Sequence, residues 1–146
     1  MMASVPARFQ EAVGASDGTS IGADLTWSVT AYVCHVADNL RISAERLVGV
    51  ARGGGPQITA YDQDDLPEVR RYDAVAIPGA LWSLEQAVGD WLTAIDVARA
   101  SDVVDEHSER GRYTWADVAS SNLHDALHHQ FDIRRTLGTA VRADRA

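Results

Sequence analysis

Apolar side chains recur at three- and four-residue steps through most of the chain, which is the spacing of one face of an α-helix. Val5, Phe9 and Val13 lie four residues apart and predict a short first helix. The next apolar stripe predicts a long helix over about residues 27–51. Its members are Val29, Val33, Val36, Leu40, Leu47 and Val50.

Two more long helices are predicted in the second half of the chain. The helix over about residues 80–99 carries an apolar stripe formed by Leu81, Leu84, Val88, Trp91, Ile95 and Ala98. The last helix begins at Thr114, because Thr114-x-x-Asp117 resembles a capping box, and it ends at Gly138, a natural C-terminal residue. Its predicted buried face carries Leu123, Leu127 and Phe131.

Segments that break helices separate these four stretches. They are residues 14–24, the GGGP run at 53–56, Pro67, Pro78-Gly79 and the charged run 105–112. The connection over residues 53–78 is long, so we expect a crossover between helices that are not antiparallel neighbours, or an additional short helix around residues 65–71. Residues 58–61 and 74–77 have the composition of short strands, but two isolated tetrads do not hold a sheet together. The sequence therefore predicts an all-α bundle of three long helices and one shorter N-terminal helix.

Composition limits the class of protein. The 146 residues, with 46% hydrophobic and 23% charged side chains, fit a single folded domain over residues 1–146. The net charge of −8 argues against nucleic acid as a partner, and one cysteine excludes an internal disulfide. No apolar run reaches the roughly 18–20 residues that cross a bilayer, and the first residues lack a signal-peptide stretch. We expect a soluble, cytoplasmic protein without a membrane partner; Trp82 and Trp91 belong to the core, their more common use, or to the face of a homodimer.

Four of the five histidines lie on two predicted helices, His35 on the second helix and the other three on the last. His124 and His128 are four residues apart, so their side chains leave one helical face a turn apart and can bind one metal ion. His35 borders the apolar stripe of its own helix. The spacing predicts a metal site of His35, His124 and His128 at the core boundary, where zinc or nickel would keep an open position for water or substrate.

Other interpretations of these residues stay open. Asp125 and His129 are also four residues apart, on a face about 100° away, so His35, Asp125 and His129 form an alternative ligand set. A His-rich helix also occurs as plain polar surface. Cys34 precedes His35, but neighbours on a helix point about 100° apart, so we expect a buried, inert thiol rather than a Cys-His nucleophile. His107 lies in the charged run, where we expect it to be exposed.

Two enzyme motifs are superficially similar to residues 124–128 (HDALH). The zinc-peptidase pattern HExxH has Glu where this chain has Asp125, and the shorter acid would set the general base about one methylene too far back. The HD phosphohydrolases are helical and metal-dependent, but their final aspartate is distant, whereas Asp132 follows here within two turns. Both classes are therefore disfavoured.

Two motifs resemble the DinB/YfiT-like superfamily. Residues 27–38 (WSVTAYVCHVAD) are similar to its tryptophan-led helix with a ligand histidine, and residues 124–128 are similar to its HxxxH on the final helix. Residues 61–64 (YDQD), together with His129 and residues 132–135 (DIRR), further resemble an actinobacterial branch related to the N-terminal domain of mycothiol-dependent maleylpyruvate isomerase. The resemblance implies a four-helix bundle with a long crossover connection and a three-histidine metal centre.

The resemblance also implies a type of chemistry. Members of the family include enzymes that use a low-molecular-weight thiol, such as mycothiol or bacillithiol, for S-transfer or isomerisation of a small-molecule substrate. The isomerases have an acid-x-x-x-His pair, here Asp125 and His129, but also a second C-terminal domain, whereas this sequence stops at Ala146. A metal-dependent thiol S-transferase is the leading expectation. A non-catalytic metal-binding or sensing domain and a helical dimer with structural histidines are the alternatives.

Position suggests roles for a few further residues around such a site. Asp125 or Asp132 is expected to orient a histidine through its second ring nitrogen. We place Tyr61, Asp62 and Asp64 at the mouth of the site. The basic residues nearest in sequence are Arg134 and Arg135, for which capping of the last helical turn is the more common role.

Overall fold

The computed structural model describes residues 1–54, 57–58, 61–107 and 111–139. Within these ranges the helices are η1 (Met2–Ser4), α1 (Val5–Val13), α2 (Val29–Ala51), α3 (Leu66–Val69), η2 (Tyr72–Ala74), α4 (Ile77–Ala100) and α5 (Trp115–Leu137). The strands of the same ranges are β1 (Gln57–Ile58), β2 (Val104–His107) and β3 (Gly111–Thr114). The protein is therefore mainly helical, as the apolar pattern predicts. None of the helices described is long and apolar enough to cross a membrane.

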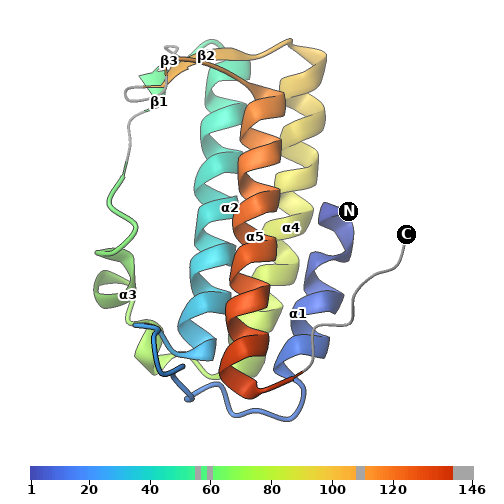
Figure 1. The fold of residues 1–146 in the computed structure, drawn as a ribbon. Coiled ribbons are helices and arrows are strands. Elements are labelled where there is room, and N and C mark those ends of the chain that lie inside the picture. The colour runs from blue at the N-terminus through green and yellow to red at the C-terminus, as the bar shows by residue number, and fades with distance from the viewer. Residues whose placement is uncertain (55–56, 59–60, 108–110, 140–146) are drawn as a thin grey trace.

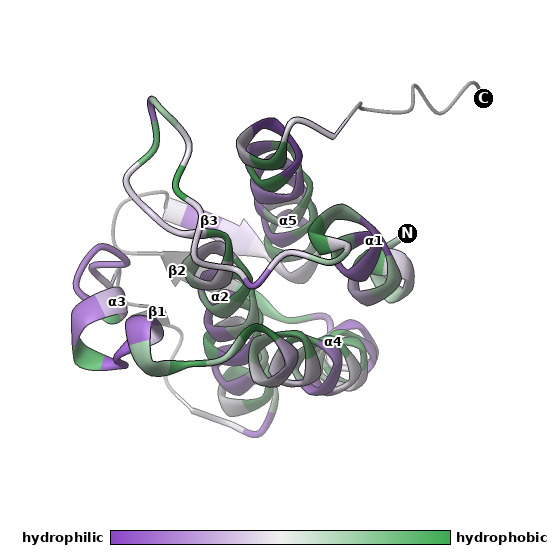
Figure 2. Ribbon diagram, turned by 90° about the horizontal axis from the view of Figure 1, so that it is seen from below, coloured by the Kyte–Doolittle hydropathy of each residue, from purple (hydrophilic) through white to green (hydrophobic). Residues whose placement is uncertain are grey.

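The long helices lie side by side, and their directions follow from the crossover. Figure 1 shows α2 and α4 running the same way, with α1 and α5 running the opposite way. α2 packs along both α4 and α5, and α1 packs against α4 and α5. Viewed along the helices, these four surround a common centre, and α3 lies outside α2 (Figure 2). The connection between α2 and α4 returns the chain along the bundle, and α3 is the short helix predicted around residues 65–71.

Local signals set the helix ends. The Ser28 hydroxyl accepts a hydrogen bond from the Ala31 amide and caps α2, and the predicted capping box of Thr114 and Asp117 is present at the start of α5. Gly138 ends α5 in the left-handed conformation, at φ 65°. α4 begins at Ile77, before the predicted break at Pro78-Gly79, because proline is tolerated in the first helical turn, where its missing N–H has no partner to lose.

A small sheet covers the end of the bundle at which α2 and α4 stop (Figure 1). β1 pairs in parallel with β2, with Gln57 opposite Glu106, and β2 pairs with β3 as an antiparallel hairpin. The charged run 105–112, predicted as a break, thus contributes both hairpin strands, because backbone pairing does not need apolar alternation. Residues 74–77 are no strand but the end of η2 and the start of α4. Some predicted positions lie outside the described residues. They are residues 55–56 and 108–110 of two predicted breaks, and residues 59–60 of the predicted strand 58–61.

The core is built mainly from α1, α2 and α4. The predicted α2 residues Val29, Val33, Val36, Leu40 and Leu47 are all at most 1% exposed, and Val5, Phe9 and Val13 of α1 are buried. In α4, Leu84, Val88, Trp91 and Ala98 are buried, whereas Trp82 is 65% exposed. The stripes of these three helices therefore predict their buried faces, and Trp91 rather than Trp82 belongs to the core.

The predicted buried face of α5 is wrong by about one position. Phe131 is 48% exposed, and Leu123 and Leu127 are only half-buried. The buried residues of the helix are Val118, Asn122, Ala126, Gln130, Asp132 and Ile133. Polar side chains occupy this face because they have specific partners. Trp91 Nε1 donates to Asn122 Oδ1 at 2.8 Å, and Gln130 exchanges hydrogen bonds with the Arg8 side chain and backbone carbonyl.

Candidate metal centre

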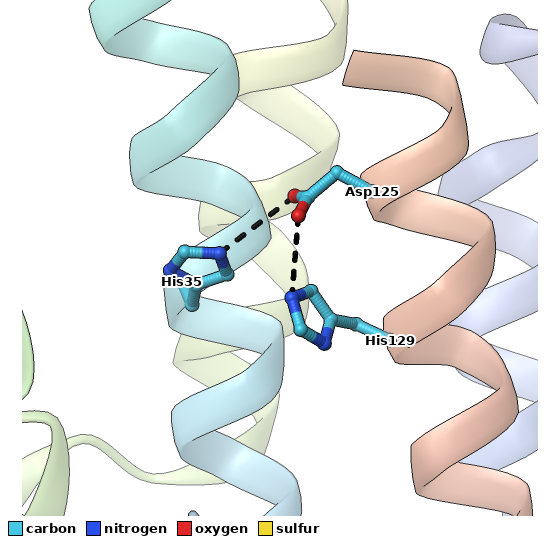
Figure 3. A group of neighbouring side chains, drawn as sticks. All are labelled: His35, Asp125 and His129. Atoms are coloured by element: carbon cyan, nitrogen blue, oxygen red, sulfur yellow. Dashed lines mark ion pairs between the residues drawn. The ribbon is translucent and has the colours of Figure 1, made fainter. Parts of the chain in front are cut away.

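Three potential metal ligands meet between α2 and α5. His35 comes from the middle of α2, and Asp125 and His129 come from consecutive turns of α5 (Figure 3). One ligand atom from each lies within 4.8 Å of the other two, and this is the one group of three His, Cys, Asp or Glu side chains found so close among the described residues. The arrangement arises because the buried face of α5 carries small and polar side chains, which turns Asp125 and His129 toward α2.

His35 is completely buried, at 0% exposure. Within the described part of the chain, neither of its ring nitrogens has a hydrogen-bond partner. Its Nε2 atom lies 3.7 Å from Asp125 Oδ2, which is longer than a hydrogen bond. The Trp27 ring packs against the imidazole, with centroids 4.9 Å apart. A buried polar group left without a partner costs about 1–3 kcal/mol, so this imidazole is the least satisfied group of the site.

Asp125 faces both histidines. Its Oδ1 lies 3.3 Å from His129 Nε2, and its Oδ2, which faces His35, accepts a hydrogen bond of 2.8 Å from Asn39 Nδ2. Burial acts to raise the pKa of this carboxyl, but its interactions with the neighbouring His129 and His35 outweigh burial and hold the pKa well below its usual range. The side chain is therefore a carboxylate at neutral pH, which is the form that binds metal.

His129 lies between two carboxylates. Its Nε2 faces Asp125, and its Nδ1 is hydrogen-bonded to Asp132 Oδ2 at 3.3 Å. Burial acts to lower the pKa of the imidazole, but the two carboxylates outweigh it and raise the pKa above its ordinary value. Asp132 thus orients the ring through its second nitrogen, the role expected for Asp125 or Asp132, and leaves Nε2 directed toward His35 and Asp125.

The donor set fits a zinc-like ion. Two imidazole nitrogens and one carboxylate oxygen are the ligands of several catalytic zinc sites, which keep a fourth position for water or substrate. The single carboxylate would leave the centre with one net positive charge. The rings of Trp27 and Tyr32 form an aromatic wall beside the histidines, with the Tyr32 centroid 5.1 Å from that of His129.

The first predicted ligand set is not brought together. His124 and His128 lie on the exposed side of α5, with their rings 6.2 Å apart, and His128 Nε2 lies 3.5 Å from Asp132 instead of near His35. The prediction placed these histidines relative to the leucine stripe, and that stripe lies at the edge of the buried face and not at its centre. The same rotation of about one residue brings the alternative set, His35, Asp125 and His129, into one cluster.

The remaining predicted residues fall into two groups. Cys34 is buried, and burial raises the pKa of its thiol to about 11, in agreement with the expected inert thiol. Tyr61 reaches the site through Asn39, whereas Asp62 and Asp64 are exposed. Farther away, the half-buried Arg134 lies 3.6 Å from Glu11, Arg135 is exposed, and the His107 backbone belongs to β2.

Sequence reasoning missed Asn39. The signal was present, because Asn39 follows His35 by four residues and therefore lies one turn away on the same face of α2. A polar amide at that spacing from a buried histidine marks a continuing polar stripe on an otherwise apolar helix. Its partner Tyr61, in the connection between helices, was named only by position.

Comparison with models of known families, with curated proteins and with solved structures finds no match. The resemblance to the DinB/YfiT-like superfamily therefore stays an expectation that rests on its sequence motifs.

Proposed function

We propose that this chain is a DinB/YfiT-like four-helix protein that holds one divalent transition metal, zinc or nickel, through His35, Asp125 and His129. The observation that carries the proposal is His35. Its imidazole is fully buried, both ring nitrogens lack a hydrogen-bond partner among the described residues, and Nε2 faces a carboxylate at 3.7 Å. A metal ion shared with Asp125 and His129 would give this nitrogen the partner that it lacks.

The proposed activity is that of a metal-dependent enzyme which uses a low-molecular-weight thiol on a small-molecule electrophile, by S-transfer or isomerisation. A zinc-like ion with an open coordination position would lower the pKa of a thiol that binds to it. The thiol would then be a thiolate, and so a nucleophile, near neutral pH. Asp132 would hold the His129 ring in place, and the Trp27 and Tyr32 rings would exclude water from one side of the cluster. The carboxylate of Asp125 makes this centre less acidifying than three neutral imidazoles would be.

A non-catalytic metal-binding or sensing domain is the second candidate. It is favoured by the low exposure of the cluster, because His35 is buried and the Asp125 and His129 side chains are only 26% and 15% exposed. Structural metal sites are closed, whereas catalytic sites admit a substrate. The two candidates share the metal and differ in whether a thiol can reach it.

The experiment has two stages. Metal analysis and cobalt substitution are carried out on the wild type and on His35→Gln, with His124→Ala, an exposed histidine of α5, as the control. We expect one metal per chain in the wild type and in the control, and loss in His35→Gln. Equal metal content in all three, or none in the wild type, would contradict the proposed site.

The second stage separates the two functions. Mycothiol, bacillithiol and glutathione are titrated into the metal-loaded wild type and followed by calorimetry and by the cobalt spectrum. A sulfur-to-cobalt charge-transfer band with one of the thiols supports the enzyme. If metal is bound and none of the three thiols binds, the thiol-dependent activity is wrong and the metal-binding or sensing domain is favoured.

A further inference from the structure

A chain of hydrogen bonds leads from the candidate ligand Asp125 to the crossover between α2 and α4. Asn39, one turn after His35 on α2, donates from Nδ2 to Asp125 Oδ2 at 2.8 Å. Tyr61, in the crossover between β1 and α3, donates from its hydroxyl to Asn39 Oδ1 at 3.1 Å. The guanidinium of Arg46 lies over the Tyr61 ring, 5.0 Å from its centroid, and packs that ring against α2.

The direction of these bonds is set by chemistry. A carboxylate only accepts, so the amide nitrogen of Asn39 must face Asp125 and its oxygen must face Tyr61. The Tyr61 hydroxyl must therefore donate. Burial, together with the charge of Asp125, raises the pKa of Tyr61 to about 12, so the hydroxyl keeps its proton throughout the neutral range.

The hydrogen bonds through Asn39 determine which oxygen of the Asp125 carboxylate is available to a metal ion. Oδ2 is held by Asn39, while Oδ1 faces His129 Nε2 at 3.3 Å. Without Asn39 the carboxylate would keep only the contact between Oδ1 and His129, and its position relative to His35 would be less closely fixed. Outer partners of this kind orient metal ligands and influence metal affinity.

The far end of the crossover is attached to α2 separately. The buried carboxylate of Asp38, next to Asn39 in sequence, accepts hydrogen bonds from Tyr72 at 2.8 Å and from Arg41, and it pairs with Arg70 at 3.2 Å. Residues 70–72 are therefore held on α2 by contacts that do not involve the candidate metal ligands. Tyr61 connects the middle of the crossover, through Asn39, to the candidate ligand Asp125.

We infer that Asn39 and Tyr61 are positioning residues that hold Asp125 in its ligand orientation and couple docking of the crossover to metal occupancy. The inference rests on the proposed metal site and adds a means of regulating it. Coupling is reciprocal, so metal binding should hold the Tyr61 segment of the crossover on α2, and loss of that contact should weaken metal binding.

The experiment uses Asn39→Leu, which removes the link at similar volume, and Tyr61→Phe, which removes only the hydroxyl. Tyr113→Phe is the matched control, because the Tyr113 hydroxyl donates to the Asp117 carbonyl near the start of α5. Zinc affinity is measured by chelator competition, the cobalt spectrum reports ligand geometry, and hydrogen exchange is followed over residues 61–69 with and without zinc.

For Asn39→Leu we expect zinc affinity to fall about 10- to 100-fold, as for other outer partners of metal ligands, and the cobalt spectrum to change. Tyr61→Phe should lose less affinity but should abolish the slowing of exchange that zinc causes over residues 61–69. Tyr113→Phe should match the wild type in all three measurements. Because Tyr61→Phe keeps the ring over which Arg46 packs, it tests the coupling even where Asn39→Leu fails to fold.

Failure of the proposed metal site and failure of the positioning role give different results. If the wild type binds no zinc or cobalt, the proposed metal site is wrong and the inference falls with it. If the wild type binds metal and loses it in Asp125→Ala, while Asn39→Leu and Tyr61→Phe bind zinc as tightly as Tyr113→Phe with an unchanged cobalt spectrum, only the positioning role is overturned. Zinc-induced slowing that persists in Tyr61→Phe would overturn the coupling to the crossover.

Discussion

α2 and α5 enclose the same candidate site but contribute to it by different physical means. α2 buries a continuous row of aliphatic side chains, and Val33, Val36 and Leu40 are at most 1% exposed. α5 presents Asn122, Ala126 and Gln130 to the interior and leaves Phe131 48% exposed. The position of α2 is thus fixed mainly by removal of apolar surface from water, whereas the rotation of α5 depends on a few directional hydrogen bonds in addition to buried apolar side chains such as Ile133.

The difference determines which chemistry the site contains. A rotation of α5 by one residue would exchange Asp125 and His129 for His124 and His128 at the α2 interface. The polar pairs of α5 oppose that rotation, because Asn122 would lose the buried Trp91 and Gln130 would lose Arg8. A polar buried face therefore selects the ligands, and a hydrophobic face provides the framework on which they are held.

The largest expected effect concerns apolar burial on the two helices. Leu40→Ala in α2 should lower the free energy of unfolding by about 2–5 kcal/mol, because it leaves a cavity in the core. Phe131→Ala in α5 should lower it by less than about 1 kcal/mol, because half of that ring is already in water. Urea denaturation of both variants measures the difference. A loss for Phe131→Ala as large as for Leu40→Ala would mean that the leucine stripe of α5 does face the core.

A smaller effect is expected from the polar face of α5. Asn122→Ala removes the acceptor of the buried Trp91 N–H and should destabilise the protein by about 1–3 kcal/mol. Gln86→Ala, at an exposed position of α4, is the control and should stay within about 0.5 kcal/mol of the wild type. Equal stability of the two variants in urea denaturation would show that hydrogen bonds do not set the rotation of α5.

The smallest expected effect is on the rate at which a thiol reagent labels Cys34, in the buried part of α2. A thiol with a pKa of about 11 is ionised only to about one part in a thousand at pH 8. We expect slow labelling of the folded protein by a disulfide reagent at pH 8, faster labelling as the pH rises toward 11, and complete labelling in urea. Rapid labelling of the folded chain at pH 8 would contradict the burial of this face of α2.

Prediction from sequence succeeded where a single physical effect dominates. The aliphatic stripe of α2 predicted its buried face, and the capping box of Thr114 with Asp117 predicted the start of α5. These features depend on local spacing alone. The length of residues 53–78 likewise indicated a crossover or an additional short helix, and the structure has both, the short helix being α3.

Prediction was incomplete where contacts between distant residues compete with local pattern. Leu127 and Phe131 suggested the wrong buried face for α5, because the partners of Asn122 and Gln130 lie in α4 and α1 and cannot be read from the helix itself. The same limit left two ligand sets open around His35. The β2–β3 hairpin was missed because its pairing is a property of the backbone.

The account is tested most directly by zinc titration of the wild type, His129→Ala and His128→Ala. The two variants remove adjacent histidines of the same helix, of which only His129 faces His35. We predict one tightly bound zinc in the wild type and in His128→Ala, and no stoichiometric binding in His129→Ala. Loss of zinc in His128→Ala with retention in His129→Ala would contradict the site of His35, Asp125 and His129 and restore the set of His35, His124 and His128.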